Sequence, residues 1–139
     1  MCELQRIMTK DFIAVGPDTS IDEAVSLLLD HKISGLPVID DEGQLVGVIS
    51  EVDIIDLVYS ADIDTSTVRD NMTLDTRSLE EDASLDDAAD LFCTHNIRRI
   101  PIVRDGRLVG IVSRRDLIRF VRDIRKLDKA QQANEPVDV

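Results

Sequence analysis

Hydrophobic and polar positions along the first half of the chain predict a short series of alternating elements. A β-rich run at 12–15 precedes apolar residues at helical spacing over 24–31, and two buried-type apolar runs follow at 36–39 and 45–49. Helical spacing returns over 53–58. Apolar residues every three to four positions predict an amphipathic helix, and short apolar runs predict buried strands. The expected order is strand, helix, strand, strand, helix.

The second half repeats this pattern at a nearly constant distance. At an offset of 64, Met8-Thr9 aligns with Met72-Thr73, and a single deletion near Glu42 changes the offset to 63. After it, 43–50 aligns with 106–113. Between residue 8 and residue 58, 20 of the 50 aligned pairs are identical. Self-similarity at a fixed period indicates a duplicated structural unit.

Local signals place the ends of these elements. Ser20 followed by Glu23 is a capping box that predicts a helix start, and Ser84 with Asp87 is its weaker counterpart in the second half. The two apolar strands of the second half are joined by Asp105-Gly106, which is a strong signal for a tight hairpin.

The pattern therefore predicts an α/β (α+β) protein made of two repeats related by a pseudo-twofold axis, each a three-stranded sheet packed with two helices. Neither half can bury both faces of its sheet alone, so we expect the sheets to stack and share one core. The predicted boundaries are 7–59 for the first repeat, 60–67 for a polar linker, 68–127 for the second repeat and 128–139 for a disordered tail.

Charge limits the possible partners. With 16 basic and 28 acidic residues, the formal net charge of −12 repels nucleic acids and anionic membranes. No apolar run approaches the ~18–20 residues that a membrane helix needs. The acidity is uneven, since residues 1–64 hold three basic against 14 acidic residues and residues 65–139 hold 13 against 14. The second half is thus the better host for an anion.

Reactive residue types are sparse. Cys2 and Cys93 are isolated, which argues against a zinc site or a disulfide scaffold, and Cys93 is expected in the core. Unpaired thiols and the lack of a visible secretory signal favour the cytoplasm. His31 and His95 recur at helix ends, which favours helix termination over catalysis or metal binding. No nucleophile–base set, phosphate loop or metal-ligand cluster is visible, so we expect no catalytic residues, no metal and no enzyme activity.

Three duplicated motifs carry a resemblance to a known family. In the second half they are Asn71-Met72-Thr73, Ile97–Val103 and Leu108–Asp116, and in the first half Ile7–Thr9, Ile33–Val38 and Leu45–Asp53. Over residues 7–125 these motifs resemble the CBS (cystathionine-β-synthase) domain family, whose tandem pair is called a Bateman module.

Two serine–aspartate pairs are candidates for a ligand site. Ser113 ends a strand and leads into a helix, where free N–H groups favour an anion, and the carboxylate of Asp116 suits two vicinal ribose hydroxyls. The family resemblance implies the same roles, and Ser50 with Asp53 is the equivalent pair. The alternative is structural, with each serine as an N-cap and each aspartate favouring the helix dipole.

The phosphate contacts are expected from the second repeat. Arg98 and Arg99 stand where the first repeat has Ser34-Gly35, and an arginine fork suits a phosphate. Arg99 is the preferred candidate. The resemblance places adenine against the first-strand segments and the loop before the proline of each repeat, which adds Ile97, Pro101, Thr76, Ser34, Pro37 and Ile13 to the candidate ligand-binding residues.

The resemblance implies a regulatory module that requires no cofactor. It would bind an adenine nucleotide (AMP, ADP or ATP) or S-adenosylmethionine between the repeats and pass the signal to an effector protein of unknown identity. It would also form a homodimer, through Ile54, Ile55 and Val58 with Leu117, Ile118 and Val121. The alternative is a ligand-independent interaction module with the same fold.

Overall fold

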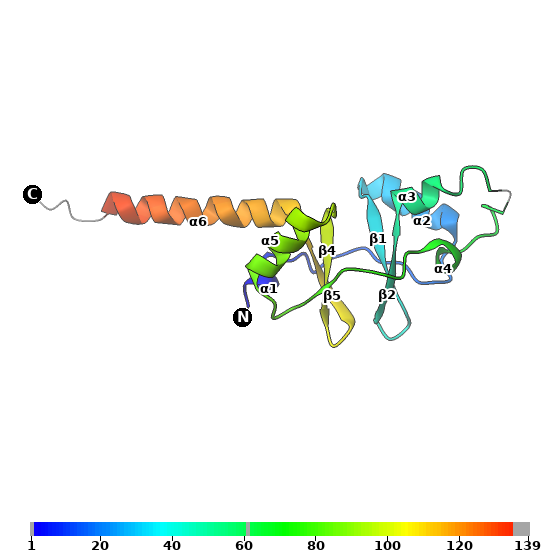
Figure 1. Cartoon of the computed structure of the whole chain (residues 1–139), viewed down its shortest axis with the longest axis horizontal. Helices are drawn as coiled ribbons and strands as arrows, with labels where there is room; N and C mark the ends of the chain where they lie inside the picture. Colours follow the sequence, from blue (N-terminus) through cyan, green and yellow to red (C-terminus); the bar gives the residue numbers. More distant parts are fainter. Residues whose placement is uncertain (1, 61, 135–139) are drawn as a thin grey trace, which may run out of the picture.

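The chain folds into two similar α/β units placed side by side, from which one long helix projects (Figure 1). The computed structural model describes residues 2–60 and 62–134, without the side chains of the last two. In chain order the elements are α1 (Glu3–Ile7), α2 (Ile21–His31), β1 (Gly35–Ile39), β2 (Leu45–Ser50), α3 (Glu51–Ile55), α4 (Val68–Asn71), β3 (Leu79–Glu80), α5 (Leu85–Thr94), β4 (Arg99–Arg104), β5 (Arg107–Ser113) and α6 (Arg114–Asn134).

Each unit is built on an antiparallel hairpin. β1 pairs with β2 and β4 pairs with β5, and each pair has one register shift near its turn. The tight turn predicted at Asp105-Gly106 is confirmed, since both residues have positive φ, 51° and 83°, as such a hairpin requires. The predicted α/β class and the duplicated hairpins are confirmed.

The third strand of each sheet is much shorter than the sequence predicts. In the first unit it is a single parallel bridge between Val15 and Val38, so the predicted strand at 12–15 is wrong. In the second unit β3 has two residues, paired with β4. The reason is a proline in each neighbouring strand. Extending either hydrogen-bond ladder toward lower residue numbers would need an N–H from Pro37 or Pro101, and proline has none.

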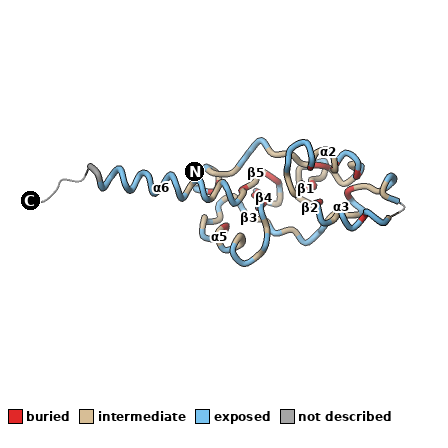
Figure 2. The backbone as a smooth tube through the Cα atoms, turned by 90° about the horizontal axis from the view of Figure 1, so that it is seen from above, coloured by how far each residue is buried: buried red, intermediate tan, exposed pale blue. Residues whose placement is uncertain are grey.

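The structure has two hydrophobic cores, so the prediction of one shared core is wrong. One lies under β1 and β2 and the other under β4 and β5, as the buried residues in Figure 2 show. Each core is completed by the other repeat. Val68, at the start of α4, is fully buried in the first core, and Leu4 of α1 is fully buried in the second. Because one unit fills a gap in the other, the two repeats are locked together.

The chain segments that follow α1 and α4 hold this exchange in place. Thr9 forms a two-way backbone bridge with Ile111 of β5, with N–O distances of 2.8 and 3.0 Å. Thr73 does the same with Val48 of β2 at the same distances. Gly47 is needed for this approach, since a Cβ there would lie 2.9 Å from the carbonyl oxygen of Thr73. A glycine is therefore found where the segment after α4 crosses β2, because the two backbones lie too close for a side chain.

The long helix α6 corrects the predicted tail. It continues to Asn134, so the prediction of a disordered segment is wrong for residues 128–134, while 135–139 lie outside the described residues. Residues 128–132 include lysine, alanine and glutamine, which are strong helix formers, and neither glycine nor proline interrupts them. From Val121 on, every described side chain of α6 is exposed (Figure 2).

Two local predictions are also corrected. Ser84 and Asp87 form the full reciprocal capping box, whereas Ser20 only accepts a hydrogen bond from the Glu23 N–H. At Ser84, the Asp87 carboxylate accepts a hydrogen bond from the serine N–H, which completes the box. Cys93 is exposed and not in the core, because the buried side of α5 is centred on Ala88. His31 ends α2 and His95 caps α5, at the helix ends that the sequence indicates.

Candidate functional site

A cavity of about 420 Å³ lies between the two repeats. Its walls come from equivalent segments, namely the start of β1 and the end of β2 in one repeat and the start of β4 with the preceding loop in the other. We call it the central cavity, and it is lined by Ser34, Gly35, Leu36, Pro37, Val48, Ser50, Glu51, Val52, Asn96, Ile97, Arg98, Arg99, Pro101 and Ile111. Its lining is mostly apolar, with serine, glutamate, asparagine and arginine side chains among the apolar ones. Such a mixture suits a flat base with polar substituents.

The central cavity gathers seven of the twelve residues that the sequence singles out. They are Ser34, Pro37, Ser50, Ile97, Arg98, Arg99 and Pro101. The two prolines are buried within their strands, and the two arginines are exposed at the margin. The grouping follows from the pseudo-twofold arrangement, which brings the start of β1 beside the start of β4.

A second hollow continues from the central cavity toward α6. This cationic groove has a volume of about 730 Å³ and shares Ser34, Arg98 and Arg99 with the central cavity. Its full lining is Lys32, Ile33, Ser34, Arg98, Arg99, Ser113, Arg114, Arg115, Ile118, Arg119 and Arg122. Seven of these residues are basic and none is acidic. In a chain with a net charge of −12, this is a local reversal of sign.

A smaller hollow, the side cavity, lies where the segment after α1 crosses the second repeat. It has a volume of about 170 Å³ and is lined in part by Phe12, Ile13 and Ser113. Arg99 also lines it, so this residue borders the central cavity, the cationic groove and the side cavity. Arg99 is thus the residue that any ligand of the inter-repeat region would meet.

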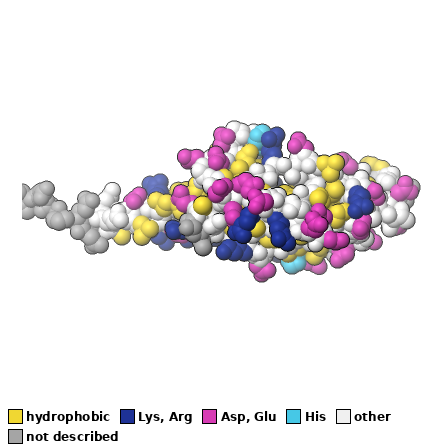
Figure 3. Space-filling view, turned by 90° about the horizontal axis from the view of Figure 1, so that it is seen from below, with side chains coloured by type: hydrophobic (Ala, Val, Ile, Leu, Met, Phe, Trp, Pro, Cys, Tyr) yellow, Lys and Arg dark blue, Asp and Glu magenta, His cyan; other side chains and the backbone are white. Residues whose placement is uncertain are grey.

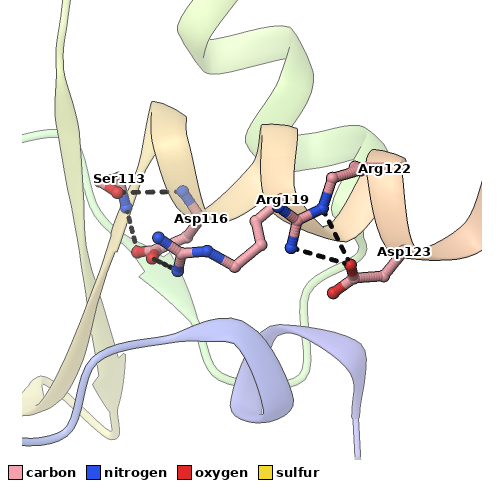
Figure 4. A network of polar contacts seen from close by, with 5 residues as sticks. All are labelled: Ser113, Asp116, Arg119, Arg122 and Asp123. Atoms are coloured by element: carbon pink, nitrogen blue, oxygen red, sulfur yellow. Dashed lines mark hydrogen bonds and ion pairs between the residues drawn. The ribbon is translucent and has the colours of Figure 1, made fainter.

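Both serine–aspartate pairs form helix caps. The N–H of Ser113 donates to Asp116 Oδ2 at 2.8 Å, and the N–H of Asp116 donates to Ser113 Oγ at 3.1 Å (Figure 4). The other carboxylate oxygen, Oδ1, lies 3.4 Å from a guanidinium nitrogen of Arg119. Ser50 and Asp53 make the same reciprocal box at the start of α3. The capping alternative that the sequence left open is therefore realised at both sites.

Three predicted residues lie outside these hollows. Asp53 and Asp116 line none of the three, because their carboxylates turn back to the caps, and Thr73 also donates to Asp53 Oδ1 at 3.2 Å. Thr76 follows α4 in an irregular segment and lines none of them either. A ribose contact by either aspartate remains a prediction.

The structure adds residues that the sequence did not single out. Glu51, Val52 and Asn96 line the central cavity, and Lys32, Arg119 and Arg122 line the cationic groove. One signal was available. Residues 115, 119 and 122 stand at helical spacing, which places three cations on one face of a helix.

Other features of the described residues bear on the class of site. No group of three histidine, cysteine or acidic side chains within 2–60 and 62–134 could hold a metal ion. In the same part of the chain, no helix has both the length and the apolar character needed to cross a bilayer. Acidic side chains are spread over much of the surface seen in Figure 3.

Comparison with known proteins gives two matches to one family model, described as the CBS domain, over residues 4–60 and 65–123. One similar relative is an inosine-5′-monophosphate dehydrogenase of Methanocaldococcus jannaschii, 38% identical over 114 residues. This match covers 81% of the chain and only 22% of the enzyme.

Two similar solved structures contain adenosine compounds. The crystal structure of CBSX2, a protein of Arabidopsis thaliana, in complex with AMP has a TM-score of 0.79 and 35% identity, and covers 90% of this chain and 99% of that one. The CBS domain pair of protein MJ0100, in complex with 5′-methylthioadenosine and S-adenosyl-L-methionine, has a TM-score of 0.73 and 32% identity, and covers 86% and 95%.

Proposed function

This chain belongs to the CBS domain family, and we propose that it is a non-catalytic regulatory module that binds an adenosine-type ligand between its repeats. The central cavity is the observation that carries the proposal. Equivalent segments of both repeats line it, its lining is mostly apolar, and Arg98 and Arg99 stand where it meets the cationic groove. An adenine would fill the apolar part, and the arginines would contact phosphate.

The similar proteins support this proposal from two directions. CBSX2 was crystallised with AMP, and the MJ0100 pair with S-adenosyl-L-methionine and 5′-methylthioadenosine. The match to one region of a much longer dehydrogenase supports action beside an effector. For this chain, the effector would be a separate protein that responds when the ligand changes the orientation of the repeats.

Thermal unfolding with a panel of adenine and guanine nucleotides and S-adenosylmethionine tests the proposal. We expect a concentration-dependent stabilisation by at least one adenosine compound, of about 2.7 kcal/mol at ~100 times the dissociation constant. Guanine nucleotides serve as the matched control for non-specific phosphate binding. Protein first verified to be free of bound nucleotide that shows no shift with any adenosine compound at millimolar concentration would contradict the proposal.

The second candidate is a ligand-independent interaction module. It is favoured by the capping roles of Asp53 and Asp116, which give both carboxylates a structural function. The panel separates the two candidates, because this one predicts no stabilisation by any nucleotide.

We also propose that the chain forms a homodimer through exposed apolar residues of α3 and α6. Ile55, at the end of α3, and Val58, three residues after it, are exposed on the first repeat, and Ile118 and Val121 are exposed on α6. Ile54 and Leu117, half-buried, complete the set that the sequence indicates. Figure 3 shows hydrophobic side chains at the surface among the charged ones of the long helix.

The dimer is tested by the substitution Ile118→Asp, at a position that is 67% exposed. Light scattering coupled to gel filtration is expected to give a dimer mass for the wild type and a monomer mass for this variant, because an interface cannot bury an unpaired carboxylate cheaply. The control is Leu74→Asp, 71% exposed and outside both helices, which should stay dimeric. A monomeric wild type at micromolar concentration would rule the dimer out.

The compartment proposed for this chain is the cytoplasm. Cys2 and Cys93 are both free and exposed. Exposed, unpaired thiols persist in a reducing compartment, where disulfides are rare.

A further inference from the structure

The charge of the cationic groove is larger than a single phosphate group needs. Seven basic residues line it, in a chain whose net charge is −12. Gathering so many like charges is unfavourable unless an anion offsets their repulsion. The groove therefore has the electrostatic character of a site for a multiply charged anion.

Most of these cations remain available for a ligand. Within residues 2–60 and 62–132, Lys32, Arg98, Arg99 and Arg115 form no ion pair with a carboxylate. Arg119 is paired with Asp116 and Arg122 with Asp123, and both arginine side chains are still more than half exposed (Figure 4).

The seventh cation has a structural role. Arg114 donates from Nε to the carbonyl oxygen of Ile97 at 2.8 Å and from a terminal nitrogen to Asn96 at 3.4 Å. These bonds fix the loop before β4, and with it the position of Arg98 and Arg99. Arg114 thus ties the start of α6 to the margin of the central cavity.

The groove adjoins the central cavity and extends onto α6. It begins at Arg98 and Arg99, which border both hollows, and follows the face of α6 that carries Arg115, Arg119 and Arg122. Seven residues of helix separate the first and last of these, a rise of about 10 Å. A ligand with its base in the central cavity would direct a chain of phosphates along this line of arginines.

We infer that the cationic groove binds the polyphosphate chain of the nucleotide, so that this chain selects adenosine di- and triphosphates over AMP and S-adenosylmethionine. The inference rests on the proposed function, since it assigns the ligand class of the same site. Each added phosphate brings more negative charge to cations that AMP leaves without a partner. S-Adenosylmethionine carries a sulfonium and an ammonium group against a single carboxylate, so its net charge is positive and the groove repels it.

Isothermal titration of AMP, ADP, ATP and S-adenosylmethionine, without divalent cations, measures this selectivity directly. We expect ATP to bind at least about tenfold more tightly than AMP, with affinity that falls more steeply as salt is raised. The double variant Arg115→Gln/Arg122→Gln should lower ATP affinity about tenfold. AMP affinity should change less than about twofold in the same variant.

The control variant is Arg125→Gln, on the same helix, also exposed and outside the groove. It should leave both affinities unchanged, and circular dichroism should show that α6 is intact in both variants. Equal binding of AMP and ATP, or a double variant that keeps the wild-type preference, overturns the inference and leaves the proposed function standing. Failure of every adenosine compound to bind overturns both.

Discussion

Replacing Leu4 by alanine is expected to lower the free energy of unfolding by about 2–5 kcal/mol, although Leu4 is only the fourth residue of the sequence. Its side chain is completely buried in the second core, among Ala88, Ile100 and Val112. Truncation to alanine removes apolar contacts and leaves a cavity, because β4 and β5 can move only partly into the space. Urea denaturation followed by circular dichroism measures the loss as a shift in midpoint at constant slope.

A matched leucine distinguishes this effect from a general loss of hydrophobicity. Leu74→Ala removes the same atoms at a position that is 71% exposed, and should change stability by less than about 0.5 kcal/mol. Val68→Ala, the equivalent change in the first core, should destabilise as well. If Leu4→Ala unfolds like the wild type, α1 does not pack on the second repeat in solution, and the exchange of segments is refuted.

Arg99→Gln should weaken binding of AMP and ATP roughly 10- to 100-fold. The estimate corresponds to the loss of one charge-assisted hydrogen bond, about 1.5–3 kcal/mol. Arg99 borders all three hollows and stands at the start of β4, where the backbone holds it firmly. Glutamine keeps a polar side chain that can still donate a hydrogen bond, but it is shorter than arginine and carries no charge. Fluorescence titration with labelled AMP and ATP gives the two dissociation constants.

The control for this charge is Arg107→Gln. Arg107 is also an exposed strand residue of the second repeat, and it lies beside Gln44 at the tips of the hairpins, away from every hollow described above. Its loss should leave both dissociation constants unchanged. Wild-type affinity in Arg99→Gln would remove this residue from the site, whatever the ligand proves to be.

The duplicated pattern predicts the local elements well and their partners poorly. Hydrophobic periodicity places α2, α5 and both hairpins, because it reports which face of an element is buried. It does not report which repeat buries that face. Leu4 and Val68 are 64 residues apart, at the same offset as the rest of the duplication, yet nothing in the pattern indicates that each completes the core of the opposite half. The third strands were predicted too long because propensity ignores the absent N–H of Pro37 and Pro101 in the neighbouring strand.

The candidate site was predicted where two signals agree. The loop and strand that begin at Ile97 combine a family motif with positive charge, and they line the central cavity. The predictions for Asp53 and Asp116 rested on a carboxylate, which suits a ribose contact and a helix cap equally. The sequence therefore left both roles open. Lys32 was missed because it reaches the cationic groove only through the fold, from a position 90 residues before Arg122. Arg122 had one sequence signal, its helical spacing with Arg115 and Arg119.

The exchange of α1 and α4 between the two cores has a consequence for the origin of the molecule. A single half-chain carries a helix suited to another core and has a gap in its own, so it is incomplete alone. Two identical half-chains would satisfy both needs reciprocally, each filling the gap of the other about a true twofold axis. The present chain has the geometry of such a dimer of one ancestral repeat, joined by residues 60–67 and then allowed to diverge. Fusion would free each half to change separately, and the second now holds 13 of the 16 basic residues.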